Sequence, residues 1–101
     1  NRSKQVAEMF DLEVSLDTDD LQVLEDYRGP AYGEPDDRVI EAIQMVGKAE
    51  GLILDPNYTG KAMSGLIGEL RAGRVAADET ICFIHSGGLP QLFAHADKFV
   101  D

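Results

Sequence analysis

The chain has 101 residues, of which 44% are hydrophobic and 28% are charged, a composition typical of a globular protein and not of a disordered tail. Its net charge of −10 and its short apolar runs predict that neither a nucleic acid nor a membrane is a partner. One cysteine and two histidines exclude an internal disulfide and a structural zinc site, so we expect no metal and a reducing, cytoplasmic location.

The first third of the chain predicts a helix, a turn and a short extended segment. Apolar residues recur at helical spacing over residues 3–11, and this helix is already under way at the first residue, so we expect a piece of a longer protein. Turn-forming residues at 16–20 precede an extended segment from Leu21 to Glu25. Two prolines and two glycines then predict an irregular loop over residues 28–35, which we call the proline loop.

Two longer helices are predicted in the middle of the chain. One begins near Pro35, carries a broad apolar face and ends at Gly47 or Gly51. The other covers residues 58–72, and its interior glycines indicate close packing against a neighbouring backbone.

Short apolar runs lie between and after these helices. Residues 52–54 and 80–85 each predict a buried strand, and residues 89–94 predict a short final helix. Strands that alternate with helices in this way build parallel sheets through right-handed crossovers. The sequence therefore predicts an α/β fold, with a partial open parallel sheet and flanking helices.

Residues suited to ligand binding lie at three places, although no complete phosphate-binding P-loop or dinucleotide motif is present. Tyr32 lies between two prolines and is either a substrate contact or a cover for the edge of the core. Tyr58 and Thr59 follow the first predicted strand, where helix N-termini present free amide donors; the alternative is a capping threonine beside a packed tyrosine. Ser86 and Gly87 follow the last strand and either receive a flat ligand or form a plain turn.

Two long motifs carry a resemblance to a known family. Residues 50–63 read EGLILDPNYTGKAM, and residues 83–93 read FIHSGGLPQLF. With the loop around Tyr32, they resemble the C-terminal region of the D-cysteine desulfhydrase and 1-aminocyclopropane-1-carboxylate deaminase family, from about Tyr27 to Phe93. The resemblance implies that residues 1–101 are the C-terminal part of the large cofactor-binding domain of an enzyme with the tryptophan synthase β-subunit fold.

The resemblance also implies roles for the candidate residues. Tyr58 and Tyr32 match two active-site tyrosines of the family and would be catalytic. Ser86 matches the position that hydrogen-bonds the pyridine nitrogen of the cofactor, pyridoxal 5′-phosphate, and we assign Gly87 and Thr59 to cofactor binding as well. Thr59 and Ser86 stand where the deaminases typically have glutamate and leucine, so both positions favour a desulfhydrase.

The implied function is that of a lyase that converts D-cysteine to pyruvate, hydrogen sulfide and ammonia by β-elimination. Within the family, the alternatives are a deaminase or a lyase for another β-substituted amino acid, such as a sulfonate. Outside it, they are a non-catalytic α/β module that binds a small ligand and an interaction domain with an acidic face. The family's Schiff-base lysine and phosphate loop belong to earlier parts of the enzyme, so we expect the 101-residue piece alone to be inactive. Its expected partners are an amino-acid substrate, the remainder of the catalytic domain and a second subunit in a homodimer.

Overall fold

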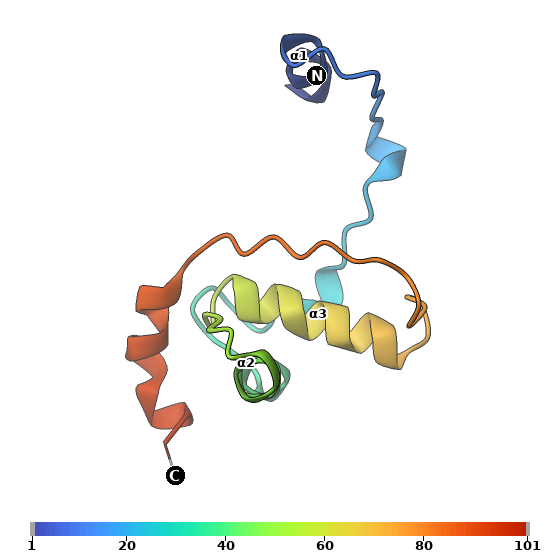
Figure 1. The fold of residues 1–101 in the computed structure, drawn as a ribbon. Coiled ribbons are helices and arrows are strands. Elements are labelled where there is room, and N and C mark those ends of the chain that lie inside the picture. The colour runs from blue at the N-terminus through green and yellow to red at the C-terminus, as the bar shows by residue number, and fades with distance from the viewer. Residues whose placement is uncertain (1, 101) are drawn as a thin grey trace.

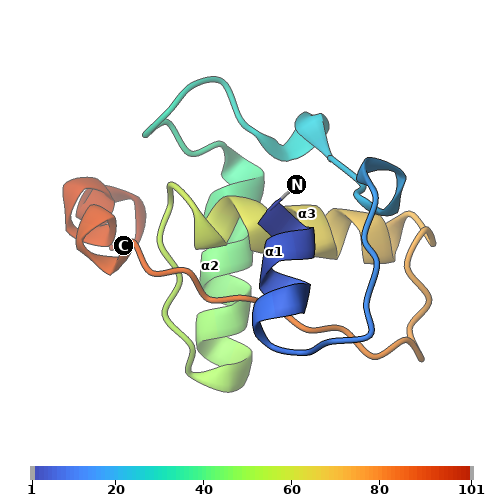
Figure 2. The same ribbon diagram turned by 90° about the horizontal axis from the view of Figure 1, so that it is seen from above.

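Two α-helices, α2 (Asp37–Glu50) and α3 (Thr59–Arg71), pack against each other at the centre of the molecule (Figure 1). The structure is a computed structural model and describes residues 2–100. Before these helices come α1 (Arg2–Met9) and two short 3-10 helices, η1 (Thr18–Asp20) and η2 (Glu25–Tyr27). After them comes η3 (Leu89–Lys98), also a 3-10 helix. In Figure 2 the axes of α2 and α3 cross, and η3 lies to one side of α2.

The helices form where the sequence predicts them because their ends carry suitable residues. Asp36 accepts a hydrogen bond from the amide of Val39 (3.1 Å) at the start of α2, and Gly51 ends this helix in the left-handed conformation at φ 68°. The close packing predicted for the glycines of α3 is confirmed, since a Cβ on Gly60 would lie 2.4 Å from the backbone oxygen of Asp55. The first and last predicted helices are confirmed as α1 and η3, although η3 is longer than expected.

A small hydrophobic core joins α2 to the segments that follow it. Its buried members are Val39 and Ile43 of α2 and Leu54 of the connection to α3. Because the end of the chain also contributes to this core, residues beyond α3 are held against α2. The partly buried side chains packed around the core are Val46, Met63, Phe83, Leu92 and Phe99.

The predicted α/β fold with a parallel sheet is wrong for residues 2–100, which contain helices and no strand. The predicted extended segment at residues 21–25 and the predicted strands at 52–54 and 80–85 are irregular chain, except that η2 begins at Glu25. The one isolated β-bridge among the described residues pairs Ala31 with Glu34 inside the proline loop. A strand needs a second strand that receives its backbone N–H and C=O groups, and no described residue supplies this pairing for the two apolar runs. A side-chain contact links the runs instead, with Nε2 of His85 at 2.8 Å from the carbonyl oxygen of Ile53.

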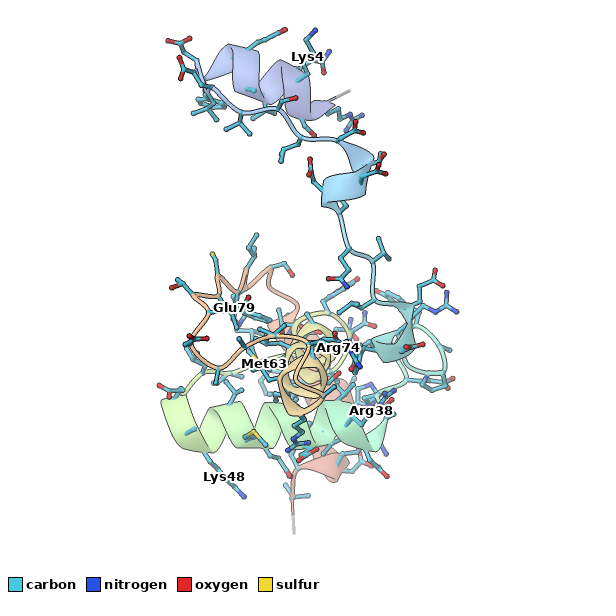
Figure 3. The ribbon with its side chains drawn as sticks, turned by 90° about the vertical axis from the view of Figure 1, so that its right-hand side faces the viewer. Lys4, Arg38, Lys48, Met63, Arg74 and Glu79 are labelled. Carbon is cyan, nitrogen blue, oxygen red and sulfur yellow. The ribbon has the colours of Figure 1, made fainter. Side chains whose placement is uncertain are left out.

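Residues 2–21 form an arm that stands away from the body of the molecule (Figure 1; Figure 3). Figure 3 shows Lys4 on this arm, far from Arg38, Met63 and Arg74 of the body. No residue of α1 is buried. The arm accounts for a radius of gyration of 16.0 Å, compared with about 13 Å for a compact domain of this length. None of the described helices has the length and apolar character that crossing a membrane requires.

Candidate functional site

One buried carboxylate organises the turn that leads into α3. The side chain of Asp55 accepts hydrogen bonds from the backbone amides of Asn57 (2.7 Å), Tyr58 (2.8 Å) and Thr59 (2.7 Å). It also accepts one from the Thr59 hydroxyl (2.6 Å), which in turn accepts from the Asp55 amide (2.9 Å). These bonds join residues of the same turn to one another, and Tyr58 remains exposed to solvent.

The same hydrogen bonds keep Asp55 ionised. Burial favours the neutral acid, but the bonds from the Thr59 hydroxyl and from three backbone amides outweigh burial, and the pKa of Asp55 lies below its ordinary value. The next amide, that of Gly60, donates to the backbone oxygen of Asp55 (2.7 Å). Of the free amide donors predicted at this helix end, those of Thr59 and Gly60 are therefore already occupied by Asp55.

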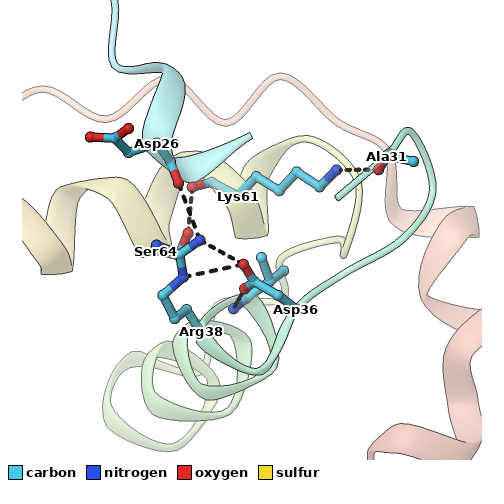
Figure 4. A network of polar contacts seen from close by, with 7 residues as sticks. Asp26, Ala31, Asp36, Arg38, Lys61 and Ser64 are labelled. Carbon is cyan, nitrogen blue, oxygen red and sulfur yellow. Dashed lines mark hydrogen bonds and ion pairs between the residues drawn. The ribbon is translucent and has the colours of Figure 1, made fainter. Parts of the chain in front are cut away.

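Two hydrogen bonds hold the proline loop against the start of α3. Nζ of Lys61 donates to the carbonyl of Ala31 (2.9 Å; Figure 4). The amide of Gly33 donates to Oδ1 of Asn57 (2.9 Å). Tyr32 lies between the two anchored residues of the loop, so these bonds set its position relative to α3.

Tyr32 and Tyr58 meet as a hydrogen-bonded pair. Their phenol oxygens lie 2.5 Å apart, and their rings meet edge to face with centroids 6.0 Å apart. The hydrogen bond with Tyr32 is the main cause that raises the pKa of Tyr58; burial and the negative charge of Asp55 add to it, and the side-chain amide of Asn57 opposes it. Tyr58 keeps its proton at neutral pH, as an ordinary phenol does, and the higher pKa makes it a weaker acid than a free tyrosine.

An open cavity of about 410 Å³ lies at this pair. Arg28 and Lys61 bring positive charge to its lining, while Asn57 and the two tyrosines bring amide and hydroxyl groups. Such a lining suits a small molecule that carries a carboxylate. The remaining lining residues are Pro30 and Ala31.

The turn that contains Ser86 approaches the same carboxylate. Gly88, at φ 93°, packs so closely on Asp55 that a Cβ would lie 2.7 Å from the carboxylate carbon. Ser86 is exposed, and its hydroxyl has no hydrogen-bond partner among the described residues. Around Gly87, at φ 101°, a Cβ would meet nothing within 4 Å. Ser86 and Gly87 thus form an accessible polar edge beside the Asp55 turn, outside the lining of the tyrosine cavity.

The structure therefore brings Tyr32 and Tyr58 together and places Ser86 and Gly87 on a separate turn. Thr59 is different, because its hydroxyl both donates to and accepts from Asp55 and belongs to the framework of the turn. Among residues 2–100, no three His, Cys, Asp or Glu side chains are grouped in a way that would hold a metal ion.

Asp55 and Asn57 are site residues that sequence reasoning missed. The signal for Asp55 was an acid placed just before a helix, where its carboxylate can accept the first amides. No sequence signal marks Asn57, because its role depends on contact with Gly33, 24 residues away along the chain.

Known proteins match most of the chain. Residues 2–87 match the family model described as "Pyridoxal-phosphate dependent enzyme". Over 78 residues the chain is 47% identical to the D-cysteine desulfhydrase of Salmonella newport (strain SL254), and to the same extent to those of Salmonella heidelberg (strain SL476) and Salmonella enteritidis PT4 (strain P125109). The matched part is 77% of this chain and 24% of each relative, so the chain spans about a quarter of the length of these curated relatives. The resemblance carried by the two motifs is thereby confirmed, and the chain belongs to the family of pyridoxal-phosphate dependent enzymes.

Proposed function

We propose that the chain is the C-terminal part of the large catalytic domain of a D-cysteine desulfhydrase-type lyase. In the proposed reaction, D-cysteine and water give pyruvate, hydrogen sulfide and ammonia by β-elimination. The observation that carries the proposal is the Tyr32–Tyr58 pair beside a cavity with cationic side chains, because this elimination needs a proton donor near a bound amino-acid carboxylate. The 47% identity to proteins named D-cysteine desulfhydrase supports the same reaction class.

The Ser86 turn fits one edge of pyridoxal 5′-phosphate. The Ser86 hydroxyl is free among the described residues to bond a ring nitrogen, and the open backbone at Gly87 allows a flat ring to approach. Thr59 contributes indirectly, since it holds the neighbouring turn in place. The bound cofactor supplies an electron sink that makes the Cα proton of an amino acid acidic. A serine hydroxyl, unlike a carboxylate, does not hold a proton on the ring nitrogen, which suits the loss of a β leaving group.

Tyr58 serves as the acid of the elimination. The phenol is protonated at neutral pH, and this proton passes to the sulfur that leaves with the electron pair of the C–S bond. Tyr32 orients the phenol through the 2.5 Å hydrogen bond. Arg28 and Lys61 attract the substrate carboxylate into the cavity.

The proposal extends to partners and location. Lys61 is engaged with the carbonyl of Ala31. The family resemblance implies that the lysine that bonds the cofactor belongs to the remainder of the catalytic domain. The complete enzyme acts on a small amino acid as a homodimer in the cytoplasm. A reducing compartment suits the free, exposed thiol of Cys82.

The test is Tyr58→Phe in the complete enzyme that contains this chain. Release of pyruvate from D-cysteine should fall roughly 100-fold or more, because general acid catalysis contributes about 10²–10⁴-fold. The absorbance of the bound cofactor should not change. Tyr27→Phe is the matched control, because it removes the hydroxyl of a tyrosine that donates to Glu69 (3.0 Å) and does not line the cavity.

Undiminished pyruvate release by Tyr58→Phe would remove Tyr58 from the mechanism. The same assay with cysteate and with 1-aminocyclopropane-1-carboxylate tests the substrate. Faster turnover of either compound than of D-cysteine would replace the proposed activity with another one of the same family.

A further inference from the structure

Asn57 is buried, and only half of its side-chain amide is satisfied within residues 2–100. The residue is 5% exposed, its Oδ1 accepts from the amide of Gly33 (2.9 Å), and its Nδ2 has no hydrogen-bond partner. This orientation of the amide is determined by chemistry, because Gly33 offers an N–H and only an oxygen can accept it. Buried donors in folded proteins nearly always have a partner, so an unpartnered Nδ2 beside an active-site pair calls for an explanation.

Tyr58 is the group to which this N–H is able to donate a hydrogen bond. Asn57 lines the same cavity as the two tyrosines, but its Nδ2 is shielded from solvent, so a molecule in the cavity does not reach that atom directly. The amide nevertheless acts on Tyr58, since it lowers the pKa of the phenol. Nδ2 has no hydrogen-bond partner while Tyr58 is bonded to Tyr32, so it remains available for a change in the state of Tyr58.

We infer that Asn57 is a positioning residue with two functions: its Oδ1 holds the proline loop in place, and its Nδ2–H receives the Tyr58 oxygen after that phenol has lost its proton. The inference deepens the proposed function and rests on the role of Tyr58 as the acid. In the elimination the proton of Tyr58 goes to sulfur, together with the electron pair of the broken C–S bond. The phenolate that remains accepts hydrogen bonds from Tyr32 and Asn57 until water returns a proton. Hydrogen bonds to an ionised oxygen are about twice as strong as those to a neutral one, so this donor acts on the ionised form.

The charged and titratable groups around Tyr58 come from several segments. Asp55, in the same turn, opposes the formation of a phenolate. Arg28 of the proline loop and Lys61 of α3 line the cavity and favour it. The segment that packs on Asp55 carries His85, whose ring is bonded to the Ile53 carbonyl. Because several groups act together, loss of the Asn57 donor should shift the ionisation of Tyr58 without abolishing it.

Two substitutions in the complete enzyme separate the functions of Asn57. Asn57→Asp keeps an oxygen for the Gly33 amide and removes the donor, whereas Asn57→Leu removes both. In Asn57→Leu the pKa of Tyr58 should rise by about one to two units, the size expected for a hydrogen bond to a charged group. In Asn57→Asp it should rise further, because the new carboxylate also repels a phenolate. The readout is NMR of tyrosine labelled with ¹³C at Cζ, and the Tyr58 signal is identified by its absence in Tyr58→Phe.

Asp36→Asn is the matched control, because it exchanges the same two residue types at the start of α2, outside the cavity. It should leave the Tyr58 signal unmoved. Turnover gives a second readout. The rate falls at high pH as Tyr58 ionises, so in each Asn57 variant this limb of the pH profile should move upward by the amount that the pKa of Tyr58 rises in that variant, and the plateau should fall roughly tenfold.

An unchanged pKa of Tyr58 in both variants overturns the inference, whatever the turnover. A shift in Asn57→Leu alone also overturns it, because Asn57 would then act only through the loop. If the pKa of Tyr58 shifts in both variants but the enzyme does not consume D-cysteine, the role of Asn57 is supported and the proposed substrate is refuted.

Discussion

The Asp55 turn and the N-terminal arm show two different degrees of local order. In the turn, every acceptor of Asp55 meets a donor within five residues, and all the residues concerned except Tyr58 are buried. In the arm, a capping box between Asp17 and Asp20 is also complete, yet Met9 and Phe10 remain 75% and 66% exposed. Local hydrogen bonds thus suffice to shape the backbone, but burial needs a partner surface that the arm does not find among the described residues.

The largest expected effect comes from breaking the better-ordered region. Asp55→Ala leaves three buried or half-buried amides and the Thr59 hydroxyl without their acceptor. The free energy of unfolding should fall by about 3 kcal/mol or more, as measured by denaturant unfolding of the chain. Thr59→Val removes one of these bonds and also the acceptor of the Asp55 amide, and should cost about 2 kcal/mol. Equal losses in the two variants would show that Asp55 is not the centre of the turn.

A pair of glycine substitutions tests packing between the helices and η2. Gly68→Ala should lower the free energy of unfolding by about 1–3 kcal/mol, because its Cβ would lie 2.5 Å from the Tyr27 hydroxyl and displace that ring. Gly47→Ala is the matched control on α2. Its Cβ would meet only the oxygen of Leu52 at 3.7 Å, so the gain in helix propensity should stabilise the chain by about 0.5–1 kcal/mol. Thermal or denaturant unfolding should therefore give opposite signs for the two variants, and the same sign in both would contradict the packing described.

The smallest expected effect concerns the arm. Phe10→Ser should change the free energy of unfolding of the 101-residue chain by less than about 0.5 kcal/mol, because the ring is largely exposed. In the complete enzyme the same substitution should cost about 2 kcal/mol or more, because the arm then buries its apolar side chains. Denaturant unfolding of both proteins measures the difference, and equal values would mean that the arm has no partner surface in the complete enzyme.

Features set by nearby residues were predictable from the sequence, and features set by distant ones were not. The ends of α2 follow from Asp36 and Gly51, which act on adjacent backbone groups. The β-branched residues at 80–85 misled the fold prediction, because they favour a strand only where a neighbouring strand exists. The two tyrosines were candidates from their places in the sequence, and the family resemblance gave them catalytic roles. The contact between Gly33 and Asn57 could not be predicted from the sequence, since it depends on how the proline loop folds over α3.

The hydrogen bond between Gly33 and Asn57 has a consequence for the length of α2, because it closes a ring of polypeptide that contains this whole helix. One residue inserted into α2 would rotate everything beyond it by about 100° and add about 1.5 Å. Either Val39 and Ile43 would then leave the core, or the proline loop would swing away and separate the two phenols. The number of residues in α2 is therefore coupled to the approach of the Tyr32 and Tyr58 hydroxyl groups. The exposed connection at residues 76–80, by contrast, is free to accept insertions.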